Sequence, residues 1–204
     1  FMGLAGRFTY AYADRYFAEF NFGYNGSENF APDNRFGFFP SVGLGWAVSN
    51  EKWFEPASKV INFMKLRATW GKVGNAKITG RRFAYLATIQ NKGSYTFGQN
   101  GDQSFSGLEI GEEAVDVSWE TAYKWNLGLD INTLSNALSL HADVFYDMRE
   151  GIFLARGDLP WYVGMTNMPL GNLGKVKNKG FEVSAEYKKQ FNDDWFLSLM
   201  ANCS

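Results

Sequence analysis

Apolar and polar side chains alternate along most of this chain with a period of two residues. From Leu4 to Tyr12 every second residue is apolar or aromatic apart from Gly6, and the residues between them are small, polar or charged. This alternation is typical of a β-strand whose two faces meet different surroundings. The pattern recurs eight times and predicts strands at residues 3–13, 16–24, 38–48, 63–73, 121–131, 138–147, 179–189 and 195–203. Helical periodicity is scarce, so the predicted fold class is all-β, with antiparallel strands.

The connections between these strands alternate in length. "ADR", "INTLSNA" and "QFNDD" are short, whereas residues 25–37, 74–120 and 148–178 are long, polar and rich in Gly, Asn and Asp. Residues 49–62 lie on the short-turn side but are longer. We expect a helical turn there, begun by Ser49 or Asn50 as its cap.

The longest connection contains two segments of strand composition. "RRFAYLATI" and "SYTFG" predict a small sub-strand or hairpin within it. The segment "GQNGDQSFSGLEIGEEAVD" is Gly-rich and acidic, and we expect it to be an exposed loop.

The alternation by itself does not say which face of the sheet is inside. In a soluble sandwich the aromatic face would be the buried core, whereas in a transmembrane barrel it would face lipid and the charged face would line a wet lumen. Three features favour the barrel. Most of the predicted strands have the length of about 9–11 residues that a tilted membrane strand needs, rather than the soluble average of about 5–6. The alternation of short turns with long loops and the tyrosines at strand ends are also typical of outer-membrane barrels.

On the barrel interpretation, Phe8, Tyr10, Phe20 and Phe22 face lipid and a set of charged side chains faces the lumen. The predicted lumen-facing residues are Arg7, Glu19, Lys65, Arg67, Lys124, Asp130 and Glu182. We expect these charges to pair with one another across strands or with a plug domain. Gly, Ala and Ser are also frequent on this face and would not fill the narrow interior of an eight-stranded barrel. The eight strands are therefore expected to belong to a larger ring.

Composition narrows the chemistry that the chain can perform. The formal net charge is −1, and no basic run is interleaved with aromatics, so we predict no nucleic-acid binding. His141 is the only histidine and Cys203 the only cysteine, so the chain cannot build a His-rich metal site or an internal disulfide. We predict that the chain is not an enzyme and has no catalytic residue, metal or cofactor. The expected role of His141 is that of a polar lumen-facing residue.

Five sequence blocks carry a resemblance to a known family. They are "FFPSVGLGWAVSNEKWF", "INFMKLRATWGKVGN", "WETAYKWNLGLDI", "ADVFYDMREGIFL" and "NLGKVKNKGFEVSAEY". In order and spacing they resemble the C-terminal barrel region of the SusC-like TonB-linked (TonB-dependent) outer-membrane transporters, and they span most of the chain. The resemblance implies a barrel of roughly 22 strands with an internal plug. Residues 1–204 would be part of that barrel, with the plug domain, the TonB-binding segment and the remaining strands absent.

The same resemblance implies a function. Members of the family import oligosaccharides or peptides across the outer membrane of Gram-negative bacteria. They are powered by the TonB complex, which would act through the absent N-terminal part, and they work with a SusD-like surface lipoprotein. Two alternatives from other classes stay open at this point, a soluble glycan-binding β-sandwich and a passive porin.

One long loop offers candidate contacts for a substrate or for the lipoprotein lid. In "ARGDLPWYVGMTNMPLGNLGK", Trp161 and Tyr162 lie in an irregular segment that is predicted to be extracellular, with Arg156 and Asp158 as polar neighbours. Exposed aromatic rings can stack on sugar rings or seat a partner. The alternative is that Trp161 packs against the base of its own loop.

Overall fold

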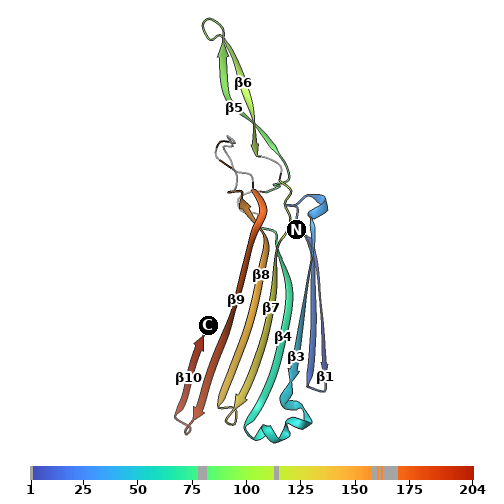
Figure 1. Cartoon of the computed structure of the whole chain (residues 1–204), viewed down its shortest axis with the longest axis vertical. Helices are drawn as coiled ribbons and strands as arrows, with labels where there is room; N and C mark the ends of the chain where they lie inside the picture. Colours follow the sequence, from blue (N-terminus) through green and yellow to red (C-terminus); the bar gives the residue numbers. More distant parts are fainter. Residues whose placement is uncertain (1, 78–81, 113–114, 158–159, 161, 163–169) are drawn as a thin grey trace.

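The computed structural model describes residues 2–77, 82–112, 115–157, 160, 162 and 170–204. Eight strands form one antiparallel sheet in the order β1-β2-β3-β4-β7-β8-β9-β10 (Figure 1). They are β1 (Met2–Tyr12), β2 (Tyr16–Gly26), β3 (Phe36–Ala47), β4 (Ile61–Asn75), β7 (Glu120–Thr133), β8 (Leu138–Ala155), β9 (Leu170–Gln190) and β10 (Phe196–Cys203). Each of the eight predicted strands is present, which confirms the all-β antiparallel fold.

The connections gather at two ends of the sheet. The short turns after β1, β7 and β9 lie at one end together with the segment between β3 and β4, and the long connections lie at the other end (Figure 1). We call these the short-turn end and the long-loop end. The alternation of turn lengths that the sequence predicts is therefore confirmed.

The segment between β3 and β4 forms the expected helical turn, but its cap is different. Two 3-10 helices occur there, η2 (Val48–Asn50) and η3 (Lys52–Lys59), and they follow Ala47 and Glu51 without a side-chain cap hydrogen bond. The prediction of Ser49 or Asn50 as the cap is wrong, because these side chains bond elsewhere. Asn50 donates from Nδ2 to the carbonyl oxygen of Asp14, 2.6 Å away, in the neighbouring turn.

The long-loop end contains more strand than the sequence predicts. β8 and β9 continue into the predicted loop 148–178 and pair as far as Ala155 opposite Leu170. A bulge beside Gly151, whose φ is 70°, breaks the alternation there, and lysines and glycines interrupt it in β9. Strand length was underestimated because the alternation stops before the backbone pairing does.

β5 (Thr88–Phe97) and β6 (Gln103–Glu112) form a separate two-stranded sheet. This hairpin projects beyond the long-loop end (Figure 1). It confirms the predicted hairpin, although only the last two residues of "RRFAYLATI" belong to β5. The prediction of an exposed loop over "GQNGDQSFSGLEIGEEAVD" is wrong for the ten residues of β6, where Ser and Gly weaken the strand pattern.

Cross-strand pairing keeps the two faces of the large sheet separate. Arg67 lies opposite Gly128, and Gly128 lies opposite Asp143. One residue away, Leu127 lies opposite Val144 on the other face. The register is regular from β1 to β4, from Phe63 of β4 to β7, and from β7 across β8 as far as Lys175 of β9. The charged positions therefore share one face and the large apolar positions share the other. We call them the polar face and the apolar face.

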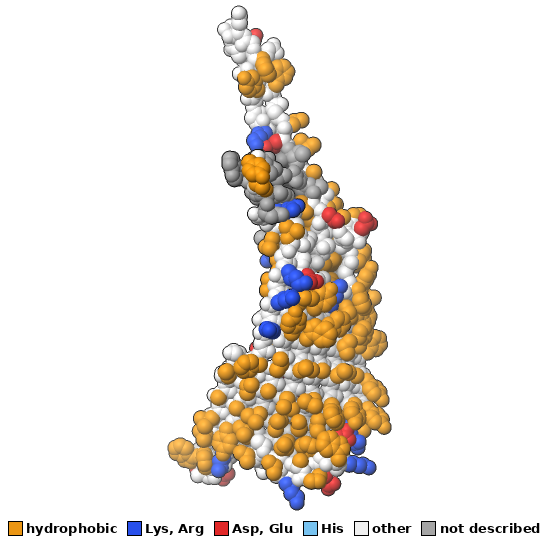
Figure 2. Space-filling model, viewed as in Figure 1, with side chains coloured by type: hydrophobic (Ala, Val, Ile, Leu, Met, Phe, Trp, Pro, Cys, Tyr) orange, Lys and Arg blue, Asp and Glu red, His pale blue; other side chains and the backbone are white. Residues whose placement is uncertain are grey.

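The apolar face is uncovered in the part of the chain that the structure describes. Phe8 is 66% exposed and Leu127 is 64% exposed. In Figure 2 hydrophobic side chains form a continuous band over the lower part of the sheet, and charged side chains gather at its edges. A soluble sandwich would pack a second sheet on such a face, and none does so among the described residues. An apolar surface of this extent marks contact with a membrane or a partner.

Buried hydrophobic residues are few and lie at both ends of the sheet. Ala47, Val48 and Phe54 are buried at the short-turn end. The others form a cluster at the long-loop end. Phe30, Ala84 and Val117 form a small core from three connections, with Trp119 and Phe153 packed against it. Within the described ranges, no helix is long and apolar enough to cross a membrane.

Candidate functional site

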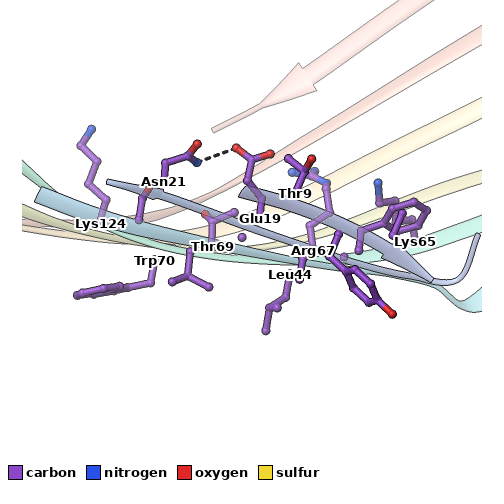
Figure 3. Close-up of a pocket in the computed structure, with 18 residues that line it drawn as sticks. Thr9, Glu19, Asn21, Leu44, Lys65, Arg67, Thr69, Trp70 and Lys124 are labelled. Atoms are coloured by element: carbon purple, nitrogen blue, oxygen red, sulfur yellow. Dashed lines mark hydrogen bonds between the residues drawn. The ribbon is translucent and has the colours of Figure 1, made fainter. Parts of the chain in front are cut away.

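The polar face of the sheet brings the seven predicted charged residues together on one side. The register places Arg7, Glu19, Lys65, Arg67, Lys124, Asp130 and Glu182 on this face. In Figure 3 the polar side chains extend from one side of the sheet, whereas Leu44 and Trp70 extend from the other. A hollow of about 790 Å³ follows β1 to β4, and its polar lining includes Glu19, Asn21, Lys65, Arg67 and Thr69. The face therefore presents charged and hydroxyl groups rather than a closed catalytic pocket.

Arg67 is the centre of the strongest ion-pair network on this face. Its Nε lies 2.7 Å from Asp130 Oδ2 and its Nη2 lies 2.9 Å from Asp130 Oδ1, which is a bidentate pair. The same Nη2 lies 3.2 Å from Asp143 Oδ2, and His141 Nδ1 lies 2.9 Å from Asp130 Oδ1. One guanidinium thus joins carboxylates of β7 and β8 to β4. The predicted cross-strand pairing is confirmed here. His141 lies on the same polar face, opposite Asp130, and its exposure to a lumen stays a prediction.

A glycine makes this network possible. A Cβ atom at Gly128 would lie 2.7 Å from Arg67 Cζ and 2.6 Å from Asp143 Oδ1, which is closer than real Cβ contacts allow. The absence of a side chain in β7 leaves the space that the guanidinium occupies. The small residues of the polar face therefore make room for charged side chains of the neighbouring strands.

Two further pairs lie toward the edges of the polar face. Arg7 Nη2 lies 2.7 Å from Glu19 Oε2, and Asn21 Nδ2 donates to Glu19 Oε1 over 2.7 Å. Lys124 Nζ lies 4.0 Å from Asp147 Oδ2. Both pairs are substantially exposed, so solvent screens them and each contributes little to stability.

Two of the seven residues have no ion pair within the described parts of the chain. Lys65 Nζ lies 4.8 Å from the ring centroid of Phe17, a cation–π contact. Glu182 lies opposite Asp143 in the register, so two carboxylates are neighbours there. These positions leave one positive and one negative charge on the polar face.

The candidate loop is only partly described. Arg156 is exposed, and Tyr162 is 74% exposed. Trp161 and Asp158 lie outside the described residues. A contact of this loop with a substrate or a lid therefore stays a prediction.

Sequence reasoning missed a second site, at the short-turn end. Glu51 Oε1 accepts hydrogen bonds from Tyr16 Oη over 2.6 Å and from Trp46 Nε1 over 3.1 Å, and Oε2 lies 3.5 Å from Arg15 Nη1. The hydrogen bond from Tyr16 is the main cause that holds the pKa of Glu51 below its ordinary value, and that from Trp46 adds to it. No pattern in the sequence points to this role, because Glu51 and Lys52 together look like an ordinary exposed charged pair at the start of a helical turn.

Sequence reasoning also missed the apolar surface of the β5–β6 hairpin. Ile89, Tyr95, Phe97, Phe105 and Leu108 are all more than half exposed. The ring centroids of Tyr95 and Phe97 are 4.8 Å apart, and those of Phe97 and Phe105 are 5.8 Å apart. A projecting two-stranded hairpin with an exposed aromatic cluster is suited to contact with another protein.

No metal site is built from the residues that the structure describes, where no three His, Cys, Asp or Glu side chains gather closely enough to hold an ion.

Comparison with protein families gives a match over nearly the whole chain. The family described as "TonB dependent receptor-like, beta-barrel" matches residues 3–203. TonB-dependent receptor P3 of Formosa agariphila is 33% identical over 200 residues, which are 98% of this chain and 19% of that protein. TonB-dependent receptor SusC of Bacteroides thetaiotaomicron is 29% identical over 197 residues, 97% of this chain and 19% of that protein. The chain thus spans about a fifth of the length of these relatives.

Solved structures give the same fold. The RagAB peptide importer in its "open-open" state superposes with a TM-score of 0.80 at 24% identity, over 98% of this chain and 21% of that one. The structure titled RagAB peptide transporter superposes with a TM-score of 0.79 at the same identity. The eight strands therefore have the arrangement of one part of a larger barrel.

Proposed function

We propose that this chain is part of the wall of a nutrient importer. The chain belongs to the TonB-dependent receptor-like β-barrel family, which matches residues 3–203. TonB-dependent receptors are outer-membrane β-barrel proteins of Gram-negative bacteria, so the chain is located in that membrane. In this proposal residues 1–204 are part of the receptor barrel, and the plug domain and remaining strands are supplied by sequence outside them.

The two faces of the sheet are the observation that carries the proposal. An outer-membrane barrel has an apolar band toward lipid and a polar interior. The uncovered apolar face, with Leu127 64% exposed, suits the lipid side. The polar face, with Arg67 paired to Asp130 and Asp143, suits the lumen side. Lys65 and Glu182, which have no ion pair among the described residues, are candidates for contact with a plug.

The proposed cargo is an oligosaccharide or a peptide. The structural neighbour named RagAB peptide importer supports a peptide, and the sequence resemblance to SusC-like transporters supports an oligosaccharide as well. In the candidate loop, Tyr162 and Trp161 would stack on a sugar ring or a peptide side chain, with Arg156 and Asp158 as hydrogen-bonding neighbours.

The proposed partners are a SusD-like surface lipoprotein on the extracellular side and the TonB complex on the periplasmic side. The exposed aromatic cluster of the β5–β6 hairpin supports the first, because it projects from the long-loop end, which is extracellular in barrels of this class. TonB would act through sequence outside these residues, as the family name implies.

Uptake by cells tests this proposal. A strain that carries the full-length protein should take up a labelled cargo oligosaccharide or peptide, and deletion of the tonB gene should abolish the uptake. The candidate loop is tested in the same assay, where Trp161→Ala with Tyr162→Ala should lower the apparent affinity several-fold. Trp53→Ala is the matched control, because Trp53 is an exposed aromatic residue (62%) at the short-turn end. Uptake that continues unchanged without TonB would contradict active import and support a passive porin.

A further inference from the structure

The apolar face of the sheet changes to a basic surface at one place on β9. Lysine replaces apolar side chains there as β9 runs toward the long-loop end. In that direction the residues of β9 on this face are Tyr187, Ala185, Val183, Phe181, Lys179, Lys177 and Lys175. Figure 2 shows a group of Lys and Arg side chains at the upper edge of the hydrophobic band. The change from four apolar positions to three lysines is therefore a boundary on the outward surface.

An aromatic cluster marks the same boundary on the neighbouring strands. Lys179 lies opposite Tyr146 of β8, and Tyr146 lies opposite Trp125 of β7. The rings of Trp125 and Trp70 have centroids 5.9 Å apart. Because Trp and Tyr concentrate where a membrane meets water, the lysines begin at the level of the lipid headgroups and continue beyond it.

The charge at this boundary is only partly neutralised. Lys175 forms an ion pair with Glu150. Lys177 and Lys179 are exposed, and neither has a carboxylate partner among the described residues. Lys72 of β4 is also on this face and lies 5.9 Å from the ring centroid of Tyr123, the residue opposite it. Lys72, Lys177 and Lys179 thus place three positive charges at the edge of the apolar band, and no described carboxylate forms an ion pair with any of them.

We propose that Lys72, Lys177 and Lys179, the lysine patch, bind the phosphate groups of a phosphorylated glycolipid in the outer leaflet of the membrane. The patch is at the long-loop end, which faces the cell exterior in outer-membrane barrels. Its ammonium groups are compact point charges suited to phosphate, and their hydrocarbon stems can lie along the apolar face while the charges reach the headgroups. A lipid satisfies both parts of this surface, because its acyl chains cover the apolar band below the lysines, whereas a soluble phosphate would leave that band bare. The inference depends on the membrane location of the chain and not on the proposed import.

Lipid binding by the full-length protein tests the proposal. The protein is purified in detergent, mixed with diphosphorylated lipid A, with the same lipid after removal of its phosphates, or with inorganic phosphate, and analysed by native mass spectrometry. The variants are Lys177→Ala with Lys179→Ala, and the charge-preserving pair Lys177→Arg with Lys179→Arg. The control is Lys52→Ala with Lys59→Ala, which removes two exposed lysines at the short-turn end.

The proposal predicts that the bound fraction of diphosphorylated lipid A falls at least fivefold in the alanine pair, and that the arginine pair and the control keep it. The dephosphorylated lipid should bind weakly to every variant.

Equal binding of diphosphorylated lipid A by the wild type and the alanine pair would overturn the proposal. Competition by inorganic phosphate at the same concentration as the lipid would also overturn it, because the patch would then bind a soluble anion. If the alanine pair lost self-association but kept the lipid, the patch would instead be a contact with a second copy of the protein. If the alanine pair does not fold, the single variant Lys177→Ala replaces it. Its bound fraction of diphosphorylated lipid A should then fall at least twofold, and equal binding would overturn the proposal. Loss of uptake with normal lipid binding would contradict only the import function.

Discussion

Glu51 joins three segments that are far apart in the sequence. Its carboxylate accepts hydrogen bonds from Tyr16 at the start of β2 and from Trp46 near the end of β3, and it lies beside Arg15 in the first turn. The rings of Tyr16 and Trp46 stack with centroids 6.4 Å apart. These contacts fix the short-turn end of the sheet, where backbone pairing between β3 and β4 begins with Ala47 opposite Lys65.

The lowered pKa of Glu51 makes this contact sensitive to pH. Because the pKa in the folded state lies below that of the unfolded chain, which is about 4.3 for a glutamate, the stabilisation is complete above that value. It is lost as the pH falls through the folded-state pKa. We predict that the difference in unfolding free energy between the wild type and Glu51→Gln is positive at pH 7 and shrinks toward pH 3. Chemical unfolding of the full-length protein in detergent at a series of pH values measures it.

Glu55→Gln is the matched control, because Glu55 is an exposed glutamate of the neighbouring helix η3. Its difference from the wild type should stay near zero across the same pH range. A Glu51→Gln difference that stays constant with pH, or grows in acid, would contradict the role assigned to the carboxylate.

At the scale of elements, the sequence was most informative where one face of a strand is apolar. β1, β2 and β7 were predicted within two residues at each end because alternation persists to the ends of those strands. β8 and β9 run beyond their predicted ends because a bulge and a series of lysines remove the alternation while the backbone hydrogen bonds continue. The Glu51 contacts could not be predicted, because Tyr16 and Glu51 are brought together only by the pairing of β2 with β3.

The charged residues of the polar face show what alternation along single strands can and cannot predict. Alternation was sufficient to place Arg67, Asp130 and five other charges on one face, since a register with period two leaves no choice of side. It could not say which charges pair, because Arg67 and Asp130 are 63 residues apart and meet through the β4–β7 register. Lys65 is the residue directly opposite Asp130, yet its ammonium group lies over the ring of Phe17, and Asp130 pairs with Arg67 two residues further along β4.

The β5–β6 hairpin is an element whose removal should separate folding from partner binding. It forms a sheet of its own and shares no strand pairing with the large sheet. We predict that replacing residues 90–108 with a short Gly-Ser linker leaves assembly of the barrel unchanged and abolishes co-purification of the lipoprotein partner. Affinity purification from membranes, followed by identification of bound proteins, measures both outcomes.

Point substitutions on the hairpin test the same contact without deleting a whole segment. Tyr95→Ser with Leu108→Ser removes two exposed apolar side chains from the hairpin and should weaken the lipoprotein complex at least tenfold. Gln90→Ser, an exposed polar change on the same hairpin, should not. Wild-type recovery of the lipoprotein by the linker variant would contradict the role of the hairpin.

At the scale of the whole molecule, one layer of sheet separates two unlike environments. Leu127 and Val144 lie opposite each other on the apolar face, and both are at least 60% exposed. Arg67 and Asp143 lie on the polar face at the adjacent position. A soluble protein would leave this apolar surface in water, so the surface is accounted for by lipid.

A charge in the middle of the apolar face should therefore prevent normal assembly. Leu127→Arg is expected to destabilise the folded barrel by about 2–4 kcal/mol, the cost of an arginine on the lipid face near the bilayer centre. Asn126→Arg, one residue away on the polar face, should cost much less. Reversible unfolding of the full-length protein in lipid vesicles measures both, and equal stability of the two variants would mean that the faces are assigned the wrong way round.

The central claim, that the apolar face meets lipid and the polar face meets water, is tested most directly by spin-label accessibility along β7. Single cysteines at residues 124–130 of the full-length protein, in a Cys203→Ser background, are spin-labelled and reconstituted in lipid vesicles. Accessibility to oxygen, which concentrates in lipid, is compared with accessibility to a water-soluble nickel chelate. We predict a period of two, with labels at Trp125, Leu127 and Leu129 accessible to oxygen and labels at Lys124, Asn126 and Asp130 accessible to nickel. Uniform accessibility, or the opposite phase, would contradict the assignment of this chain to a membrane barrel wall in the orientation described.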